Sequence, residues 1–178
     1  MLKTLVGGWA NTPAGSLSFN TQWNTALSGT STTSQITVPT VSGGTYACTV
    51  YWGDGTSSAI TTYNDAAWTH TFPSPGIYLV RIVGTFKGIS FNNGGDRLKL
   101  LRIYQWGGFG FGNTTSFFYG CANLKITAVD APSMTSTTSF ASAFRNCNIL
   151  TTIPGINNWN MSLITSLSNC FAFSLLAE

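Results

Sequence analysis

Few side chains in this sequence could do chemistry together. The single histidine, His70, leaves one cysteine and histidine pair to consider, with Cys48. A cysteine nucleophile needs such a base within hydrogen-bonding reach. Both residues fall in runs where apolar side chains alternate with polar ones, which places them on buried strand faces. The two alternating sets are Tyr46, Cys48, Val50, Trp52 and Trp68, His70, Phe72. We therefore interpret Cys48 and His70 as structural residues.

The acidic residues offer no paired carboxylates, which a glycoside hydrolase needs on either side of its substrate. They are scattered along the chain as Asp54, Asp65, Asp96, Asp130 and Glu178. The four cysteines form no Cys-x-x-Cys pair, and with one histidine a zinc site is not expected. The glycine-rich run at 107–112 lacks the Lys-Ser/Thr of a phosphate loop. We predict a protein that is not an enzyme and holds no metal or cofactor.

The charge content favours the same conclusion. Only 13 of 178 residues are charged, which is 7%, where about 25% is usual. Their place is taken by 26 Thr, 19 Ser and 14 Asn, while the hydrophobic share is 43%. Because Thr, Ser, Asn and Gly suit strands and turns better than helix interiors, the composition predicts a mainly β protein.

Several partners and locations are excluded by composition. The net charge of +3 is too small to predict nucleic-acid binding, which needs a clustered basic surface. No segment approaches the roughly 18 apolar residues of a membrane span. The N-terminal segment holds an apolar run too short and glycine-broken for a secretory signal. We expect either that no signal is cleaved or that it was removed before this numbering begins, and that residues 1–15 form an N-terminal arm.

Residues 16–90 are expected to form a β-sandwich. Short alternating runs are separated by Gly, Pro, Asn and Asp at intervals of roughly ten residues, which is typical of a sandwich or barrel. The turn Gly53-Asp54-Gly55 follows one of these runs directly. We expect the Asp54 carboxylate to cap nearby backbone N–H groups. Calcium binding is not expected, since no second carboxylate lies close by in sequence.

Two linked motifs in this stretch carry a family resemblance. The first is Val50-Tyr51-Trp52-Gly53-Asp54-Gly55-Thr56, and the second is Thr69-His70-Thr71-Phe72-Pro73-Ser74-Pro75-Gly76-Ile77-Tyr78-Leu79-Val80. Together they resemble the PKD (polycystic kidney disease) domain pattern, W-G-D-G followed by H-x-[YF]-x-x-x-G-x-Y-x-V. The resemblance implies an immunoglobulin-like β-sandwich that serves as a spacer or binding module on extracellular proteins, and hence display and not catalysis.

The rest of the chain repeats with a period of about 26 residues, which is within the range of solenoid repeats. Equivalent positions are Leu98, Leu124, Leu150 and Phe118, Phe144, Phe171. Within one unit, Phe140, Phe144 and Cys147 fall on one face of a short helix. A short helix or helical turn and a short strand at this period predict a leucine-rich-repeat-like solenoid of about three units, with short helices, over residues 91–178.

The repeat also resembles a known family. The matching segments are Phe118-Tyr119-Gly120-Cys121-Ala122-Asn123-Leu124, Phe144-Arg145-Asn146-Cys147-Asn148-Ile149-Leu150 and Asn158-Trp159-Asn160-Met161-Ser162-Leu163-Ile164-Thr165-Ser166-Leu167. They are similar to BspA-like leucine-rich-repeat surface proteins, which implies a non-enzymatic surface role. The sequence departs from the family at Asn146, where glycine is usual, and at Ser174, where the motif cysteine is expected.

The cysteines at equivalent repeat positions, Cys121 and Cys147, should lie on adjacent coils. A coil spacing of about 5 Å is compatible with a disulfide. The alternative is two reduced thiols that pack as small hydrophobic side chains, and this is the alternative that we favour.

The last repeat ends on an apolar stretch where a solenoid usually has a polar cap. Either the natural chain continues past this numbering, or the open end packs on another subunit. We predict an assembly contact through Leu163, Leu167, Phe171, Phe173, Leu175 and Leu176.

The resemblances and the composition predict a surface display, structural or adhesion protein. Because a virion protein reaches the outside by lysis and needs no signal, a phage virion component is ranked first, as a capsid decoration or tail fibre on the virion surface. Its partners would be other virion subunits in an oligomer or lattice. The alternative is an extracellular bacterial adhesin that binds host glycans or proteins. A non-catalytic appendage of a carbohydrate-active enzyme is the third hypothesis.

Overall fold

The computed structural model describes residues 17–176 and is mainly β, which confirms the predicted fold class at that level. The strands are β1 (Ser18–Asn24), β2 (Gln35–Thr37), β3 (Thr40–Tyr51), β4 (Ser57–Ile60), β5 (Thr69–Thr71), β6 (Ile77–Ile89), β7 (Leu100–Gln105), β8 (Phe109–Gly110) and β9 (Lys125–Ile126). Two short 3-10 helices are η1 (Ala66–Trp68) and η2 (Ile156–Asn158). The arm predicted over residues 1–15 lies outside the described residues.

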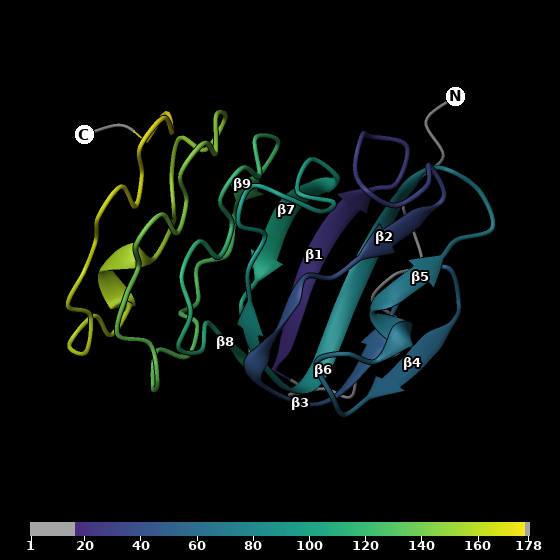
Figure 1. The fold of residues 1–178 in the computed structure, drawn as a ribbon, viewed down its shortest axis with the longest axis horizontal. Helices are drawn as coiled ribbons and strands as arrows, with labels where there is room; N and C mark the ends of the chain where they lie inside the picture. The colour runs from purple at the N-terminus through teal and green to yellow at the C-terminus, as the bar shows by residue number, and fades with distance from the viewer. Residues whose placement is uncertain (1–16, 177–178) are drawn as a thin grey trace.

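A mixed sheet organises the fold, with strand order β4-β3-β6-β1-β7-β9 and with β8 paired to β6. The pairs along β4-β3-β6-β1-β7 are antiparallel, whereas β6–β8 and β7–β9 are parallel. β2 and β5 form a separate antiparallel pair (Figure 1). Tyr46 and Trp68 meet edge to face at 5.4 Å, and the rings of Trp52 and His70 stack at 4.5 Å. These contacts pack η1 and the β2–β5 pair against one face of the sheet.

Alternation along β3 decides which face of the sheet is buried. Tyr46, Cys48 and Val50 are buried, whereas Ala47 and Tyr51 between and after them are exposed. Successive side chains in a strand point to opposite faces. The apolar set predicted from the sequence therefore forms one wall of the core.

From residue 91 on, the chain stacks on itself, and we call residues 91–176, which include β7, the stacked region (the green to yellow coils in Figure 1). Backbone N–H groups of one coil donate to carbonyl oxygens at the equivalent place in the next coil. The Phe118 N–H donates to Ala143 at 2.8 Å, and the Phe144 N–H donates to Cys170 at 2.8 Å. Each coil thus satisfies the backbone polar groups of the coil before it.

The short helix predicted through Phe140, Phe144 and Cys147 is wrong, because tight turns take its place. The Ala143 N–H donates to Phe140 at 3.0 Å and the Cys147 N–H donates to Phe144 at 3.3 Å, which are bonds of one turn. Ser142 and Asn146 have φ values of 55° and 56°. A left-handed residue interrupts the bond pattern of a right-handed helix. The spacing of Phe140, Phe144 and Cys147 is therefore satisfied by a turn with two left-handed residues.

These left-handed residues recur in each coil at matching positions. The pairs are Ser116 and Gly120, Ser142 and Asn146, and Asn169 and Phe173. The second left-handed residue of each pair is thus Gly120 in one coil and Asn146 in the next. The turn, and not the residue type, is what repeats.

One core runs through both predicted parts. β7 lies after residue 90 and yet pairs with β1, so the sheet continues beyond the predicted boundary. Phe19 of β1 stacks on Phe109 at 4.5 Å, and Trp106 contacts Trp159 edge to face at 5.4 Å. A chain of aromatic rings thereby links the sheet to the last coils.

A buried ion pair holds the junction between these parts. The Lys99 Nζ lies 3.8 Å from the Asp96 carboxylate, and both side chains are fully buried. The Asp96 carboxylate accepts the backbone N–H groups of Ser31 and Thr37 at 3.0 and 2.7 Å. The Lys99 ammonium donates to the carbonyl oxygens of Ser31, Thr32 and Gln35 at 3.1, 2.7 and 2.8 Å. Burial lowers the pKa of Lys99, and the nearby Asp96 carboxylate opposes that shift.

The left-handed turn predicts a glycine requirement at position 120. Gly120 has a φ of +84°, and a Cβ there would meet the Asn93 side chain and lie 2.6 Å from Arg97 Cδ. Gly120→Ala should lower the free energy of unfolding by about 1–3 kcal/mol, measured by urea unfolding. Gly43→Ala, with open space around its Cβ, is the control. Equal stability of the two variants would contradict the account.

Candidate functional site

The turn after β3 brings together the residues that the sequence singles out. Asp54 Oδ1 accepts the Thr56 backbone N–H at 2.9 Å and the Thr56 hydroxyl at 2.6 Å. Asp54 Oδ2 accepts a hydrogen bond from His70 Nε2 at 2.7 Å. The His70 ring lies parallel to Trp52. The carboxylate, the imidazole and the indole thus lock the end of β3 against β5.

The two glycines of this turn are required by its left-handed backbone conformation. Gly53 and Gly55 have φ values of 84° and 94°, which L side chains rarely adopt. A Cβ on Gly53 would also meet the carbonyl oxygen of Leu79 on β6. The Gly-Asp-Gly spacing is therefore explained by the turn itself.

The charge state of Asp54 follows from its partners. Burial alone raises the pKa of the Asp54 carboxyl, but the hydrogen bonds from Thr56 and His70 outweigh it and hold the pKa below its usual value. A carboxylate with a lowered pKa and three donors around it is a weak proton acceptor. It stabilises the turn and is poorly suited to general-base chemistry.

The four cysteines are free thiols and all are buried. The Cys147 thiol donates a hydrogen bond to the Phe118 carbonyl at 3.2 Å. Burial raises the pKa of Cys48 to about 11 and that of Cys147 to about 12. The thiolate is the reactive form, so these groups are inert at neutral pH. Cys121 and Cys147 are free thiols in the structure, and no disulfide joins them.

Each aspartate accepts backbone N–H groups. Besides Asp54 and Asp96, Asp65 accepts from Ala67 at 2.9 Å, and Asp130 accepts from Trp106 and Gly107 at 3.1 and 2.7 Å. Glu178 lies outside the described residues. Within residues 17–176, no three His, Cys, Asp or Glu side chains gather into a group that could hold a metal ion. The four aspartates therefore have a structural role as acceptors for backbone N–H groups.

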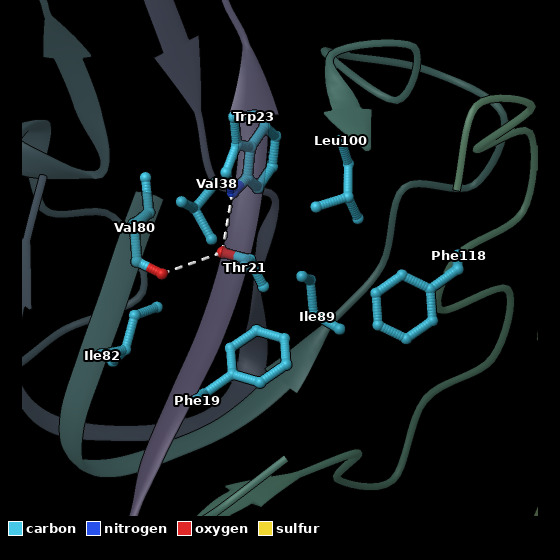
Figure 2. Close-up of a pocket in the computed structure, with 9 residues that line it drawn as sticks. All are labelled: Phe19, Thr21, Trp23, Val38, Val80, Ile82, Ile89, Leu100 and Phe118. Atoms are coloured by element: carbon cyan, nitrogen blue, oxygen red, sulfur yellow. Dashed lines mark hydrogen bonds between the residues drawn. The ribbon is translucent and has the colours of Figure 1, made fainter. Parts of the chain in front are cut away.

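An enclosed cavity lies in the core where the sheet meets the stacked region (Figure 2). Its volume is about 10 Å³, room for one water at most. The Thr21 hydroxyl that faces it donates to the Val80 carbonyl at 3.1 Å and accepts from Trp23 Nε1 at 2.9 Å. Every other side chain that lines it is apolar or aromatic, so the cavity is a packing gap and not a ligand site.

A larger groove of about 320 Å³ opens on the surface beside β7 and β9. Two cationic side chains, Arg102 and Lys125, line it together with amide and aliphatic groups. Those further groups are Gln22, Leu27, Leu101, Asn123 and Ile149. The sequence did not indicate that these residues form a binding site, because only the strand pairing brings Arg102 beside Lys125. The groove is the candidate binding site of the molecule.

The end of the stacked region exposes apolar side chains. Leu163, Leu167, Phe173 and Leu175 are between 49% and 73% exposed. The other two residues of the predicted assembly contact, Phe171 and Leu176, pack against the core. Four of the six predicted contact residues are therefore accessible.

Comparisons with protein families, with curated proteins and with solved structures find no match to this chain. Among the described residues, no helix has the length and hydropathy needed to cross a bilayer. What the chain does is therefore inferred from its own geometry.

Protonation of Asp54 should destabilise the turn. Because its folded-state pKa is lowered, its contribution is complete above the ordinary carboxyl pKa of 3.8 and is lost as the pH falls below that value. Asp54→Asn should lower the free energy of unfolding by about 1–3 kcal/mol at pH 7 and flatten its fall below pH 4. Thermal unfolding from pH 2 to pH 7 measures both effects.

Asp65→Asn is the matched control, because asparagine caps η1 as well as aspartate does. It should leave stability at pH 7 nearly unchanged. If Asp54→Asn were as stable as the wild type at pH 7, the Asp54–His70 bond would be no anchor of the turn.

Proposed function

We propose that this chain is a non-enzymatic display and assembly protein, and that it is a virion component such as a capsid decoration or part of a tail fibre. In this proposal the sheet with the β2–β5 pair is a PKD-like, immunoglobulin-like sandwich. The stacked region is a short BspA-like, leucine-rich-repeat-like solenoid. Support comes from the backbone hydrogen bonds that stack successive coils and from the turn at Asp54.

The use of the ionisable groups supports a role without catalysis. The aspartates accept backbone N–H groups, and the thiols are buried. The imidazole of His70 is hydrogen-bonded to the Asp54 carboxylate. A catalytic site usually keeps at least one such group free to meet its substrate. Because these groups are occupied by structural contacts, we infer that they stabilise a rigid scaffold.

The open end of the stack is the observation that carries the assembly proposal. In the preceding coil four N–H groups donate to the next coil at 2.8 to 2.9 Å, from Phe140, Ser142, Phe144 and Asn146. The equivalent N–H groups of the last coil make no hydrogen bond within the described residues. They belong to Leu167, Asn169, Phe171 and Phe173. A row of unpaired N–H groups is an edge that favours pairing with another chain.

Exposed side chains at the same end add an apolar contact to this edge. Leu163, Leu167, Phe173 and Leu175 would be removed from water by a second copy packed on the last coil. Burial of apolar area drives such association. We take a second copy of this chain as the occupant, which would give the oligomer or lattice of a particle coat.

A bacterial adhesin is the second candidate function, and the cationic groove beside β7 favours it because the groove offers space and two positive charges for a ligand. Antibody labelling separates the two. Label on purified particles supports the virion role, and label confined to a cell-wall fraction contradicts it.

Self-association is the direct test of the assembly proposal. In sedimentation equilibrium at micromolar concentrations, the wild-type chain should form dimers or larger species. Leu167→Lys places a charge in the contact and should shift the chain to monomer while it stays folded. The control is Val129→Lys, an exposed position away from the last coil. A wild type that is monomeric throughout would contradict the proposal.

A further inference from the structure

Two positive charges lie side by side in the groove without a counter-charge. Arg102 of β7 and Lys125 of β9 are direct partners in the parallel pairing of the two strands. Adjacent strands are about 4.8 Å apart, and like charges at that spacing repel. The only ion pairs in residues 17–176 are Asp54 with His70 and Asp96 with Lys99. No carboxylate in the described chain therefore neutralises Arg102 or Lys125.

The Arg102 guanidinium is held in a defined position. Its Cζ lies 5.3 Å from the centroid of the Tyr104 ring, over the ring face. A guanidinium that stacks on a ring keeps its N–H edge free for planar acceptors. A carboxylate matches that edge with two parallel hydrogen bonds. Lys125 is exposed beside it and adds a second cation.

The rest of the groove suits sugar rings. Leu27, Leu101 and Ile149 supply aliphatic surface, while Gln22 and Asn123 supply amides. The Asn123 amide N–H donates to the Leu98 carbonyl at 2.8 Å, which fixes the side chain. A hollow of about 140 Å³ continues past Lys125 and Ile149, lined by the threonines Thr127, Thr151 and Thr152. Hydroxyl-rich rings with apolar C–H faces fit such a mixture of groups.

Other anionic ligands fit the site less well. A nucleic acid would need a longer run of cations than the two found here. A peptide that binds by strand addition needs a free strand edge. β7 lies between β1 and β9, and the edge strand at the groove is β9, whose two residues are too short a template for a peptide strand.

We propose that the groove formed by Arg102, Lys125, Asn123 and Ile149 binds an oligosaccharide that carries a carboxylate, such as a chain of uronic acids. The carboxylate lies between Arg102 and Lys125, and the neighbouring rings extend along Ile149 toward the threonines. This inference rests on the proposed display function, and it gives the ligand of the displayed surface a chemical class.

Isothermal titration calorimetry of the full chain with three probes tests the proposal. The probes are tri-galacturonate, uncharged galactotriose and a triglutamate peptide. Tri-galacturonate should bind at least about tenfold more tightly than either of the others, and its affinity should fall with added salt. Equal affinity for galactotriose, tighter binding of triglutamate, or no binding of tri-galacturonate would each overturn the proposal.

Variants of the groove residues test whether tri-galacturonate binds in the groove. Lys125→Gln and Arg102→Gln should each weaken tri-galacturonate binding by about tenfold. Lys87→Gln, a cation on β6 outside the groove, should change it less than about twofold. Unchanged affinity in Lys125→Gln would overturn the assignment.

Thermal unfolding tests whether a weaker affinity of Lys125→Gln comes from a loss of its folded structure. Removal of one of two repelling charges should leave the midpoint of Lys125→Gln equal to or above that of the wild type. A lower midpoint would contradict the repulsion on which the proposal rests. A failure of tri-galacturonate binding would not change the self-association measured by sedimentation. The glycan proposal and the assembly proposal can therefore fail independently.

Discussion

Burial of the Lys99 ammonium is the constraint on which the rest of the fold depends. An ammonium removed from water must be surrounded by acceptors, or the fold loses several kcal/mol. The acceptors are the Ser31 and Thr32 carbonyls before β2 and the Gln35 carbonyl at its start. The counter-charge is Asp96, far along the chain, whose carboxylate accepts the Ser31 hydroxyl. Once they are in place, the Lys99 carbonyl accepts from the Asn24 N–H at 2.8 Å, and β7 begins beside β1.

The two surfaces proposed for function follow from that placement. β7 beside β1 sets Arg102 opposite Gln22, and β9 then pairs with β7 and brings Lys125 to the same groove. The coils that follow stack in the same direction until the last one presents an unpaired edge. The charged groove lies on the side of the stack and the apolar edge lies at its end, so one molecule could bind a ligand while it is packed in an assembly.

Local patterns in the sequence predicted the features that depend on nearby residues. The alternation through Tyr46, Cys48 and Val50, the Asp54 turn and the repeat period all involve short segments. The turns that replace the predicted helices were missed because the choice between a helix and a turn depends on left-handed backbone at Ser142 and Asn146, where neither residue type demands it. The groove was missed because Arg102 and Lys125 are distant in sequence, do not share a repeat position and meet only through strand pairing. The junction was missed because Ser31 and Lys99 are also distant in sequence.

The claim that the junction ties both parts into one cooperative unit is tested most directly by hydrogen exchange in Lys99→Met. Removal of the ammonium leaves the buried Asp96 carboxylate without its cation, which should cost about 3–5 kcal/mol. Amides of β2 and β7 and those of Phe118 and Phe144 in the stacked region should lose protection together, by a similar factor. The contradicting result is that the amides of Phe118 and Phe144 keep wild-type protection while only those of β2 lose it. The stacked region would then be stable independently of the junction, and Lys99 would not have the central role given to it.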